Sequence, residues 1–254
     1  MKLSIDTLPL WDGFRQTDGC PFCHIEGRLE ALFLETYLGD SVMEPDVRVE
    51  VNHKGFCREH YRLLYAQPVS KLGLALMTHT HLKETLAGVT KQMEAIDRRC
   101  DESTFLKRAT GAKDLNDALT AAAHSVEEHE ESCVVCERME LHMARYYETA
   151  CDLWHRDRDF AALFDGCQGF CLPHWSGLLA ACGGALVSKE KLTFIRHVNE
   201  MERRALGTLE EDLGWFIQKF DYRNTEKPWG NAKDALPRAV NALMGQLVQD
   251  ENAK

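Results

Sequence analysis

Residues 20–23 read Cys-Pro-Phe-Cys, and residues 55–60 read Gly-Phe-Cys-Arg-Glu-His. Residues 133–136 then read Cys-Val-Val-Cys, and residues 169–174 read Gly-Phe-Cys-Leu-Pro-His. The spacer between the second and third cysteines is 33 residues long in the first copy and 34 in the second. Two copies of CxxC…GFCxxH with nearly equal spacers indicate an internal duplication.

The duplicated motif has the composition of a metal site, because zinc prefers tetrahedral sets of thiolate and imidazole ligands. A CxxC turn places two sulfurs close enough to share one ion, and a CxxH at a helix start adds a third thiolate and an imidazole. Gly55 and Gly169 permit a tight approach of the chain just before the third ligand. We predict two structural zinc ions per chain. The eight candidate ligands are Cys20, Cys23, Cys57, His60, Cys133, Cys136, Cys171 and His174.

The pairing of these motifs has two solutions. We predict that each site closes within its own repeat, so that Cys20 and Cys23 share an ion with Cys57 and His60. The alternative is an exchanged arrangement, in which the CxxC of one repeat meets the CxxH of the other.

Other uses of the cysteines fit less well. A redox CxxC is expected in a βαβ context, which the sequence lacks. Iron–sulfur ligation remains an alternative to zinc, although four cysteines are the more usual ligand set. Cys20 to His24 matches the haem-attachment pattern CxxCH, but Glu137 replaces this histidine in the second copy. Buried thiols without metal are the structural alternative. Cys167 is a substitute ligand candidate four residues before Cys171, and packing is expected for Cys100, Cys151 and Cys182.

Helical periodicity surrounds the motifs and predicts an all-α fold: a duplicated helical unit with two long packed helices and two zinc-stapled CxxC/CxxH knuckles. Both long helices carry apolar stripes with a period near 3.5, and both stripes are predicted to pack into the core. The first stripe comprises Leu72, Leu76, Leu82, Leu86, Val89, Met93 and Ile96. The second comprises Leu192, Ile195, Val198, Met201, Ala205, Leu209, Leu213, Phe216 and Phe220.

The segments between the motifs differ in the two copies. Val47, Val49 and Val51 alternate with polar residues, which favours a short strand or an extended loop. The equivalent stretch 160–164 is predicted to be helical, and a polar linker is predicted from about Arg98 to Lys113. The predicted organisation is a first repeat over 1–98, a linker and second repeat over 99–220, and a C-terminal tail with a final helix over 221–254.

Composition limits the class of protein. The chain has 254 residues, 44% of them hydrophobic, which suffices for a substantial core. A formal net charge of −10 argues against a non-specific nucleic-acid surface. No apolar run reaches the roughly 20 residues of a membrane span. The N-terminus lacks the apolar stretch of a signal peptide, so we predict a cytoplasmic protein. In a reducing compartment the ten cysteines are not expected to form disulfides, and the paired Cys-x-x-Cys motifs indicate metal binding.

The tail after Phe220 lies outside the repeats and is the first place to look for a unique site. Its polar and aromatic residues are candidates to bind a small anion, or else they fasten the tail to the repeats. The candidates are Arg223, Asn224, Lys227, Trp229 and Lys233.

Together with the cysteine motifs, residues 220–224 (FDYRN), 228–230 (PWG) and 233–238 (KDALPR) resemble a family of uncharacterised bacterial proteins classed as a domain of unknown function. The resemblance covers nearly the whole chain. It implies the same fold and the same eight metal ligands, and it supplies no activity.

The function predicted from these features is a non-catalytic, zinc-binding accessory, assembly or regulatory factor that binds a protein partner. Two closed four-ligand sites leave no open coordination position, and no Gly-rich phosphate loop or nucleophile motif occurs. One alternative is a small-ligand-binding protein or enzyme with its site at the tail. Another is a thiol or metal sensor that releases zinc when its cysteines are oxidised.

Overall fold

The computed structural model describes residues 7–105 and 110–245, and every element in these ranges is a helix. The chain forms two compact units: residues 1–29 with 140–254, and residues 30–139. The boundaries fall inside α2 (Pro21–Leu38) and α7 (Val134–Arg156), so each of these helices contributes to both units. The all-α prediction is confirmed.

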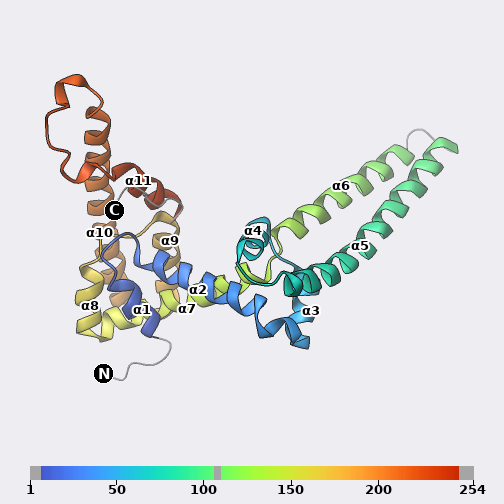
Figure 1. Ribbon diagram of the computed structural model, residues 1–254, viewed down its shortest axis with the longest axis horizontal. Coiled ribbons are helices and arrows are strands. Elements are labelled where there is room, and N and C mark those ends of the chain that lie inside the picture. Colours follow the sequence, from blue (N-terminus) through green and yellow to red (C-terminus); the bar gives the residue numbers. More distant parts are fainter. Residues whose placement is uncertain (1–6, 106–109, 246–254) are drawn as a thin grey trace. The chain divides into compact units, whose positions relative to one another are not determined.

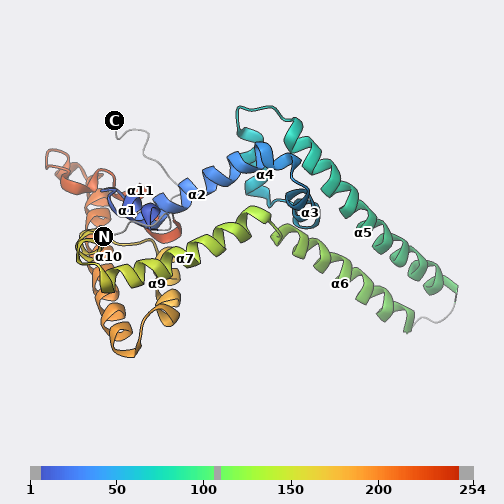
Figure 2. The same cartoon turned by 90° about the horizontal axis from the view of Figure 1, so that it is seen from below.

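The unit of residues 30–139 contains the 3₁₀ helix η1 (Asp40–Met43), α3 (Pro45–Lys54), α4 (Arg58–Ala66), α5 (Leu72–Phe105) and α6 (Thr110–Glu131). Helices α5 and α6 lie side by side as an antiparallel hairpin (Figures 1 and 2). The core lies at the base of this hairpin, where α3 packs on α5. Its buried residues include Tyr37, Val51, Phe56, Leu64 and Met77.

The other unit contains α1 (Leu8–Phe14), α8 (Arg158–Asp165), α9 (Leu172–Ala185) and α10 (Ser188–Gln218), followed by η2 (Tyr222–Asn224), η3 (Gly230–Ala232) and α11 (Ala235–Met244). Helix α10 packs against α9 and α11. An aromatic cluster forms the core beneath α1, in which Phe14 stacks on Phe164 with ring centroids 5.2 Å apart. Its other members are Trp11, Phe22, Phe160 and Phe170.

One expectation about local structure is wrong. Residues 45–54 form α3 and not a strand or extended loop. Pro45 occupies the first turn and Asp46 favours the positive helix end, and these start signals outweigh the β propensity of three valines. Most of the predicted linker is also helical, because α5 runs to Phe105 and α6 starts at Thr110. Residues 98–105 contain no glycine or proline that would end a helix.

The two apolar stripes differ in how far they are buried. On α10, Val198 and Met201 are buried as predicted, although Leu192 at its start is exposed. On α5 the stripe does not enter the core: Leu82, Leu86 and Met93 are 58–60% exposed. The core face of α5 is instead supplied by other residues, Leu74, Met77 and His81.

The predicted final helix is present as α11. The tail folds back so that α11 packs against α10. None of the helices in residues 7–105 and 110–245 combines the length and the apolar character that a membrane span requires.

Candidate metal centres

The structure brings all eight predicted ligands together in two groups of four. The first cluster is Cys20, Cys23, Cys171 and His174, and the second cluster is Cys57, His60, Cys133 and Cys136. In each cluster one ligand atom from every residue lies within 4.8 Å of the others. The prediction that each site closes within its own repeat is therefore wrong, and the exchanged arrangement is the one observed.

Helix length explains this exchange. Each CxxC starts a long helix, and the CxxH of the same repeat follows only after that helix has ended. At 1.5 Å per residue, the 18 residues of α2 carry the chain about 27 Å, and the 23 residues of α7 carry it about 35 Å. A CxxC is thus separated from the CxxH of its own repeat. The CxxH of the other repeat lies beside it and completes the group of four ligands. At the second cluster the backbone joins the exchanged motifs directly, because the Val134 N–H donates to the Gly55 carbonyl at 3.2 Å.

The distances between ligand atoms suit a tetrahedral ion. Zn–S bonds of about 2.3 Å at a tetrahedral angle place two sulfurs about 3.8 Å apart. The Sγ–Sγ distance is 3.8 Å between Cys57 and Cys136 and 3.6 Å between Cys23 and Cys171. The Nδ1 atom of His60 lies 3.2–3.3 Å from the three sulfurs of its cluster. Both clusters can accordingly hold a metal ion.

Each histidine has a carboxylate behind its ring. The ligand atom is Nδ1 in both cases, and the opposite nitrogen, Nε2, faces a glutamate of α2. This distance is 3.3 Å from His174 to Glu26 and 3.3 Å from His60 to Glu30. Carboxylates in this position fix the orientation of a metal-bound imidazole and raise its basicity. The sequence analysis did not identify either glutamate, although both follow the first CxxC on the same helix.

The close contacts within each cluster shift the pKa values of its thiols and of its histidine. Hydrogen bonding from the Cys136 thiol lowers the pKa of Cys133 to about 3, and thiol hydrogen bonds from Cys20 and Cys23 lower the pKa of Cys171. Burial by itself lowers the pKa of His60, but its contacts with Cys133 and Glu30 outweigh burial and raise that pKa to about 10. In contrast, burial raises the pKa of Cys20, and the hydrogen bond with Cys133 raises the pKa of Cys136, so one thiolate is stabilised in each cluster. Helix starts at all four motifs add the positive ends of their dipoles.

Glycine is required two residues before the cysteine of each CxxH. Gly55 and Gly169 have φ angles of 64° and 103°, which other residues rarely adopt. A Cβ on Gly55 would lie 2.4 Å from Nε2 of His81, and a Cβ on Gly169 would lie 2.6 Å from Cβ of Ala205. The long helix of each unit therefore presses against the knuckle that supplies the third and fourth ligands.

A buried polar side chain of each long helix contacts the backbone within the knuckle or a few residues before it. The Phe170 N–H donates to Oε2 of Glu202 at 2.9 Å, and Nδ1 of His81 lies 2.8 Å from the Asn52 carbonyl oxygen. Glu202 is only 4% exposed, and burial raises the pKa of its carboxyl group. Neither contact was predicted from the sequence, because a single glutamate or histidine on a long helix carries no motif.

Three of the five tail candidates, Asn224, Lys227 and Trp229, contact the segment at the end of α10. Asn224 and Lys227 hold the tail loop to the end of α10, where the buried Lys219 ammonium donates to the carbonyls of residues 224, 225 and 227 at 2.6–2.9 Å. Trp229 lies over the same ammonium, 5.0 Å from Nζ to the ring centroid. Arg223 is exposed and pairs with Asp221, and Lys233 is exposed. These contacts match the structural role that the sequence left as the alternative.

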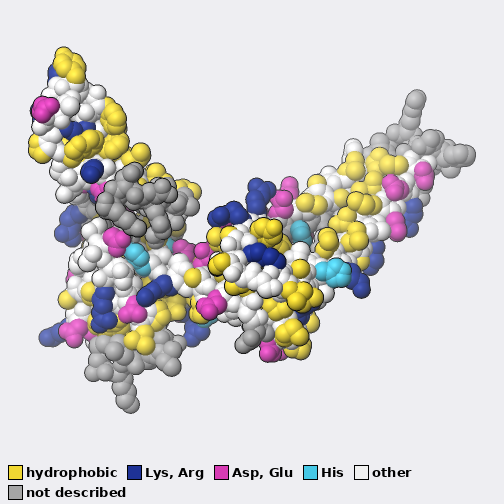
Figure 3. All heavy atoms as spheres, in the orientation of Figure 1, with side chains coloured by type: hydrophobic (Ala, Val, Ile, Leu, Met, Phe, Trp, Pro, Cys, Tyr) yellow, Lys and Arg dark blue, Asp and Glu magenta, His cyan; other side chains and the backbone are white. Residues whose placement is uncertain are grey.

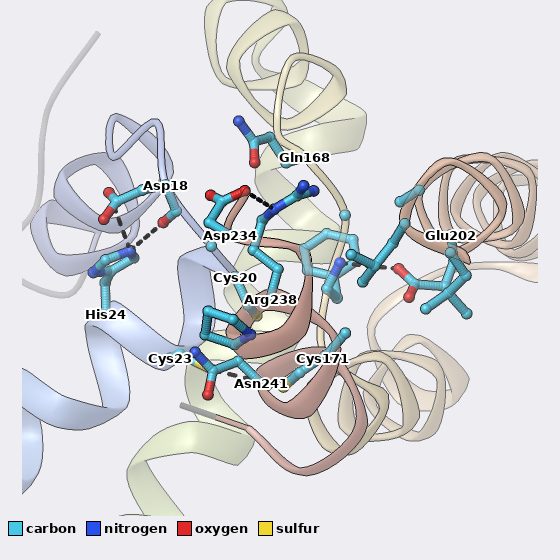
Figure 4. Close-up of a pocket in the computed structure, with 18 residues that line it drawn as sticks. Asp18, Cys20, Cys23, His24, Gln168, Cys171, Glu202, Asp234, Arg238 and Asn241 are labelled. Atoms are coloured by element: carbon cyan, nitrogen blue, oxygen red, sulfur yellow. Dashed lines mark hydrogen bonds and ion pairs between the residues drawn. The ribbon is translucent and has the colours of Figure 1, made fainter. Parts of the chain in front are cut away.

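A cavity of about 490 Å³ does lie beside the first cluster, between the knuckle, α10 and α11 (Figure 4). The tail lines it with Asp234, Arg238 and Asn241 rather than with the predicted residues. Arg238 is already engaged, since it donates to Asp212 at 2.9 Å and to Asp234 at 3.0 Å. The side chain of Glu202 reaches its wall from α10.

The remaining cysteines stay apart from the clusters. Cys167 lies outside both ligand groups, and burial raises its pKa to about 11. Cys151 and Cys182 are buried, and Cys100 is exposed on α5.

The fold and the clusters define an all-α protein with two exchanged Cys₃His sites that can hold metal. The sequence model of a family of unknown function (DUF6062) matches residues 1–250, so the chain belongs to that family, as its motifs and tail predict. No curated protein and no solved structure matches the chain.

Proposed function

We propose that this protein is a cytoplasmic, zinc-stabilised helical scaffold that binds another protein through the α5–α6 hairpin. Zinc fits the clusters because three thiolates and one imidazole close its tetrahedral shell. Four protein ligands leave no open position for substrate, so the two ions have a structural role.

The observation that carries the binding role is the apolar strip on the hairpin. Its central residues on α5 are Leu82, Leu86, Val89 and Met93, whose spacing of four, three and four residues is that of a coiled-coil seam. Leu119 and Val126 add to it from α6 and are 47% and 52% exposed. Exposed apolar seams of this kind mark surfaces that pair with another protein.

The two halves of this apolar strip face the same way. His81 of α5 stacks on His129 of α6, with ring centroids 5.1 Å apart, and marks where the helices meet. At 100° per residue, the α5 members lie roughly 80–140° around their helix from His81. Leu119 and Val126 lie roughly 60–80° around α6 from His129, in the same rotational sense. When two helices are antiparallel, side chains that are rotated in the same sense from the contact line point to the same side of the pair. Figure 3 shows hydrophobic side chains gathered along α5 and α6.

The test is comparative capture of partners from the cells that naturally produce the protein. Leu86→Asp with Met93→Asp should abolish the capture of a partner that the unchanged chain retains. The matched control is Leu192→Asp on α10, which alters an equally exposed leucine outside the apolar strip. A partner list unchanged by the double substitution would refute the proposed role of the hairpin. Elemental analysis should find two zinc ions per chain in both variants.

The cavity beside the first cluster favours a second candidate function, the binding of a small ligand. A volume of about 490 Å³ lies within the range of small-molecule sites, and the tail closes one side of it. A compound that raises the melting temperature of the unchanged chain, but not that of an Ala242→Trp variant, would support this function. Equal responses of the two chains would refute it.

A further inference from the structure

We propose that the occupant of the apolar strip is an amphipathic helix of another protein, with an apolar 3.5-residue seam flanked by lysine or arginine. This inference rests on the proposed function and specifies the chemistry of the partner.

A helix is the element that fits, because α5 and α6 offer side chains and no free backbone. Their N–H and C=O groups are used within the helices, and no strand edge occurs in residues 7–105 and 110–245. Two antiparallel helices that expose one apolar side form a shallow groove into which a third helix packs. From Leu82 to Met93 the seam is about 16 Å long, which corresponds to about three turns of a bound helix.

The charges along the two edges of the apolar strip specify the flanks of that helix. At 100° per residue, Glu127 and Glu130 border it on the outer side of α6. On the outer side of α5 the border residues are Lys83, Glu94 and Asp97. All five are exposed. Four acidic groups against one basic group favour lysine or arginine at the flanking positions of the bound helix, where charges set the choice of partner.

The same charges disfavour a second copy of this chain as the occupant. Two copies paired through the apolar strip would place one predominantly acidic border beside another. The chain as a whole has a formal net charge of −10, which adds repulsion between copies at low ionic strength. A basic helix meets neither obstacle.

The inference is tested with the full zinc-loaded chain and two designed 21-residue peptides. Both peptides repeat a heptad with leucine at positions a and d and alanine at b, c and f. One carries lysine at positions e and g, and the other carries glutamate there. Fluorescence anisotropy of labelled peptides gives the dissociation constants, and sedimentation velocity gives the oligomeric state of the chain.

We expect the lysine peptide to bind about tenfold or more tightly than the glutamate peptide, with a preference that shrinks as salt rises. Leu86→Ser with Met93→Ser should weaken its binding about tenfold or more, because the bound leucines lose their apolar contacts. Glu127→Gln with Glu130→Gln should weaken binding of the lysine peptide about threefold to tenfold and should strengthen binding of the glutamate peptide, because the repulsion of its glutamates is reduced. The matched controls on α10, Leu192→Ser and Glu210→Gln with Glu211→Gln, should change neither constant.

The contrary outcomes separate the two proposals. Equal affinity for both peptides, with both lost in the leucine and methionine variant, would overturn the basic partner and leave the hairpin as a binding surface. A dimer that this variant converts to a monomer would make a second copy the occupant and overturn the inference. Two results would overturn the inference together with the proposed function, provided that the chain is also monomeric. One is that neither peptide binds, and the other is that Leu86→Ser with Met93→Ser leaves the binding unchanged.

Discussion

The exchanged clusters predict which pairs of cysteines depend on the same ion. Cys57 and Cys133 belong to different repeats and share the second cluster, whereas Cys57 and Cys20 belong to one repeat and lie in different clusters. Cys57→Ser should leave one zinc per chain. Adding Cys133→Ser should also leave one, because that ion is already lost. Adding Cys20→Ser instead should leave none.

Stability should follow the same pattern. An ion that binds the folded chain and not the unfolded chain stabilises by RT ln(1 + [Zn]/Kd), which is about 4 kcal/mol when free zinc is 1,000 times Kd. Loss of the second cluster should lower the free energy of unfolding by about this amount, and the melting temperature by about 8–16 °C. The same-cluster double variant should add less than about 0.5 kcal/mol. The different-cluster double variant should add about 4 kcal/mol more, since distant sites are additive.

The assay is elemental analysis after gel filtration, followed by urea unfolding at fixed free zinc. Limited proteolysis locates the damage: Cys57→Ser should expose the region around Cys133, in the other repeat. The reasoning is refuted if the Cys57→Ser, Cys20→Ser chain keeps one zinc while the Cys57→Ser, Cys133→Ser chain keeps none. That result would show that each ion stays within its own repeat.

Three further perturbations test the surroundings of the clusters. Gly55→Ala should lower the free energy of unfolding by more than about 1 kcal/mol in urea unfolding, because the new Cβ would lie 2.4 Å from His81. The control Gly88→Ala, which has open space around it, should raise the free energy of unfolding by about 0.5–1 kcal/mol. Glu202→Ala should cost about 1–3 kcal/mol by leaving the Phe170 N–H without an acceptor, and Glu202→Gln, which keeps an acceptor, should cost less than half as much; equal costs would contradict this role. Under a limiting oxidant the second cluster, with half-buried Cys57 and Cys136, should release its metal before the first cluster, in which Cys20 is half-buried and Cys23 and Cys171 are buried. A zinc dye follows the release in chains that carry only one intact cluster.

Sequence periodicity and motif spacing were sufficient to predict the all-α fold and the eight ligands, but the predicted pairing within each repeat was wrong. The spacers of 33 and 34 residues are nearly equal, so both arrangements use the same residues. The pairing depends on how far α2 and α7 extend before the chain turns. Helix ends are the least certain part of a sequence prediction, because capping signals shift them by several residues. The pairing was therefore accessible only from the three-dimensional structure.

The error on α5 has a different origin. A 3.5-residue apolar period shows that a helix has a partner along one side, and it does not show that the partner belongs to the same chain. The stripe on α10 is partly buried within its own unit, whereas Leu82, Leu86 and Met93 are exposed. The periodicity was read correctly, but core packing was the wrong inference from it. The exposed seam on α5 is instead part of the proposed interaction surface.

The glutamates behind His60 and His174 could not be assigned to their clusters from the motifs alone. Glu26 and Glu30 lie three and seven residues after Cys23, on one face of α2, yet they serve different clusters. Residue spacing alone would have connected both to the nearest CxxC. The exchange of knuckles brings His60 to Glu30, and this contact has no signal in a search confined to one repeat.

The exchange also changes what the duplication means for folding. In a pair of independent zinc modules each half would reach its stable state alone. Here Cys23 and Cys171 are 148 residues apart in the chain and lie 3.6 Å apart at their sulfurs. Neither half contains four ligands that meet, so residues 1–98 alone should fail to close a tetrahedral site, although they carry CxxC and CxxH. Contacts so distant in sequence form late in folding, after the cost of closing long loops. A metal ion at either cluster would therefore stabilise only a chain in which both repeats have been synthesised and have come together.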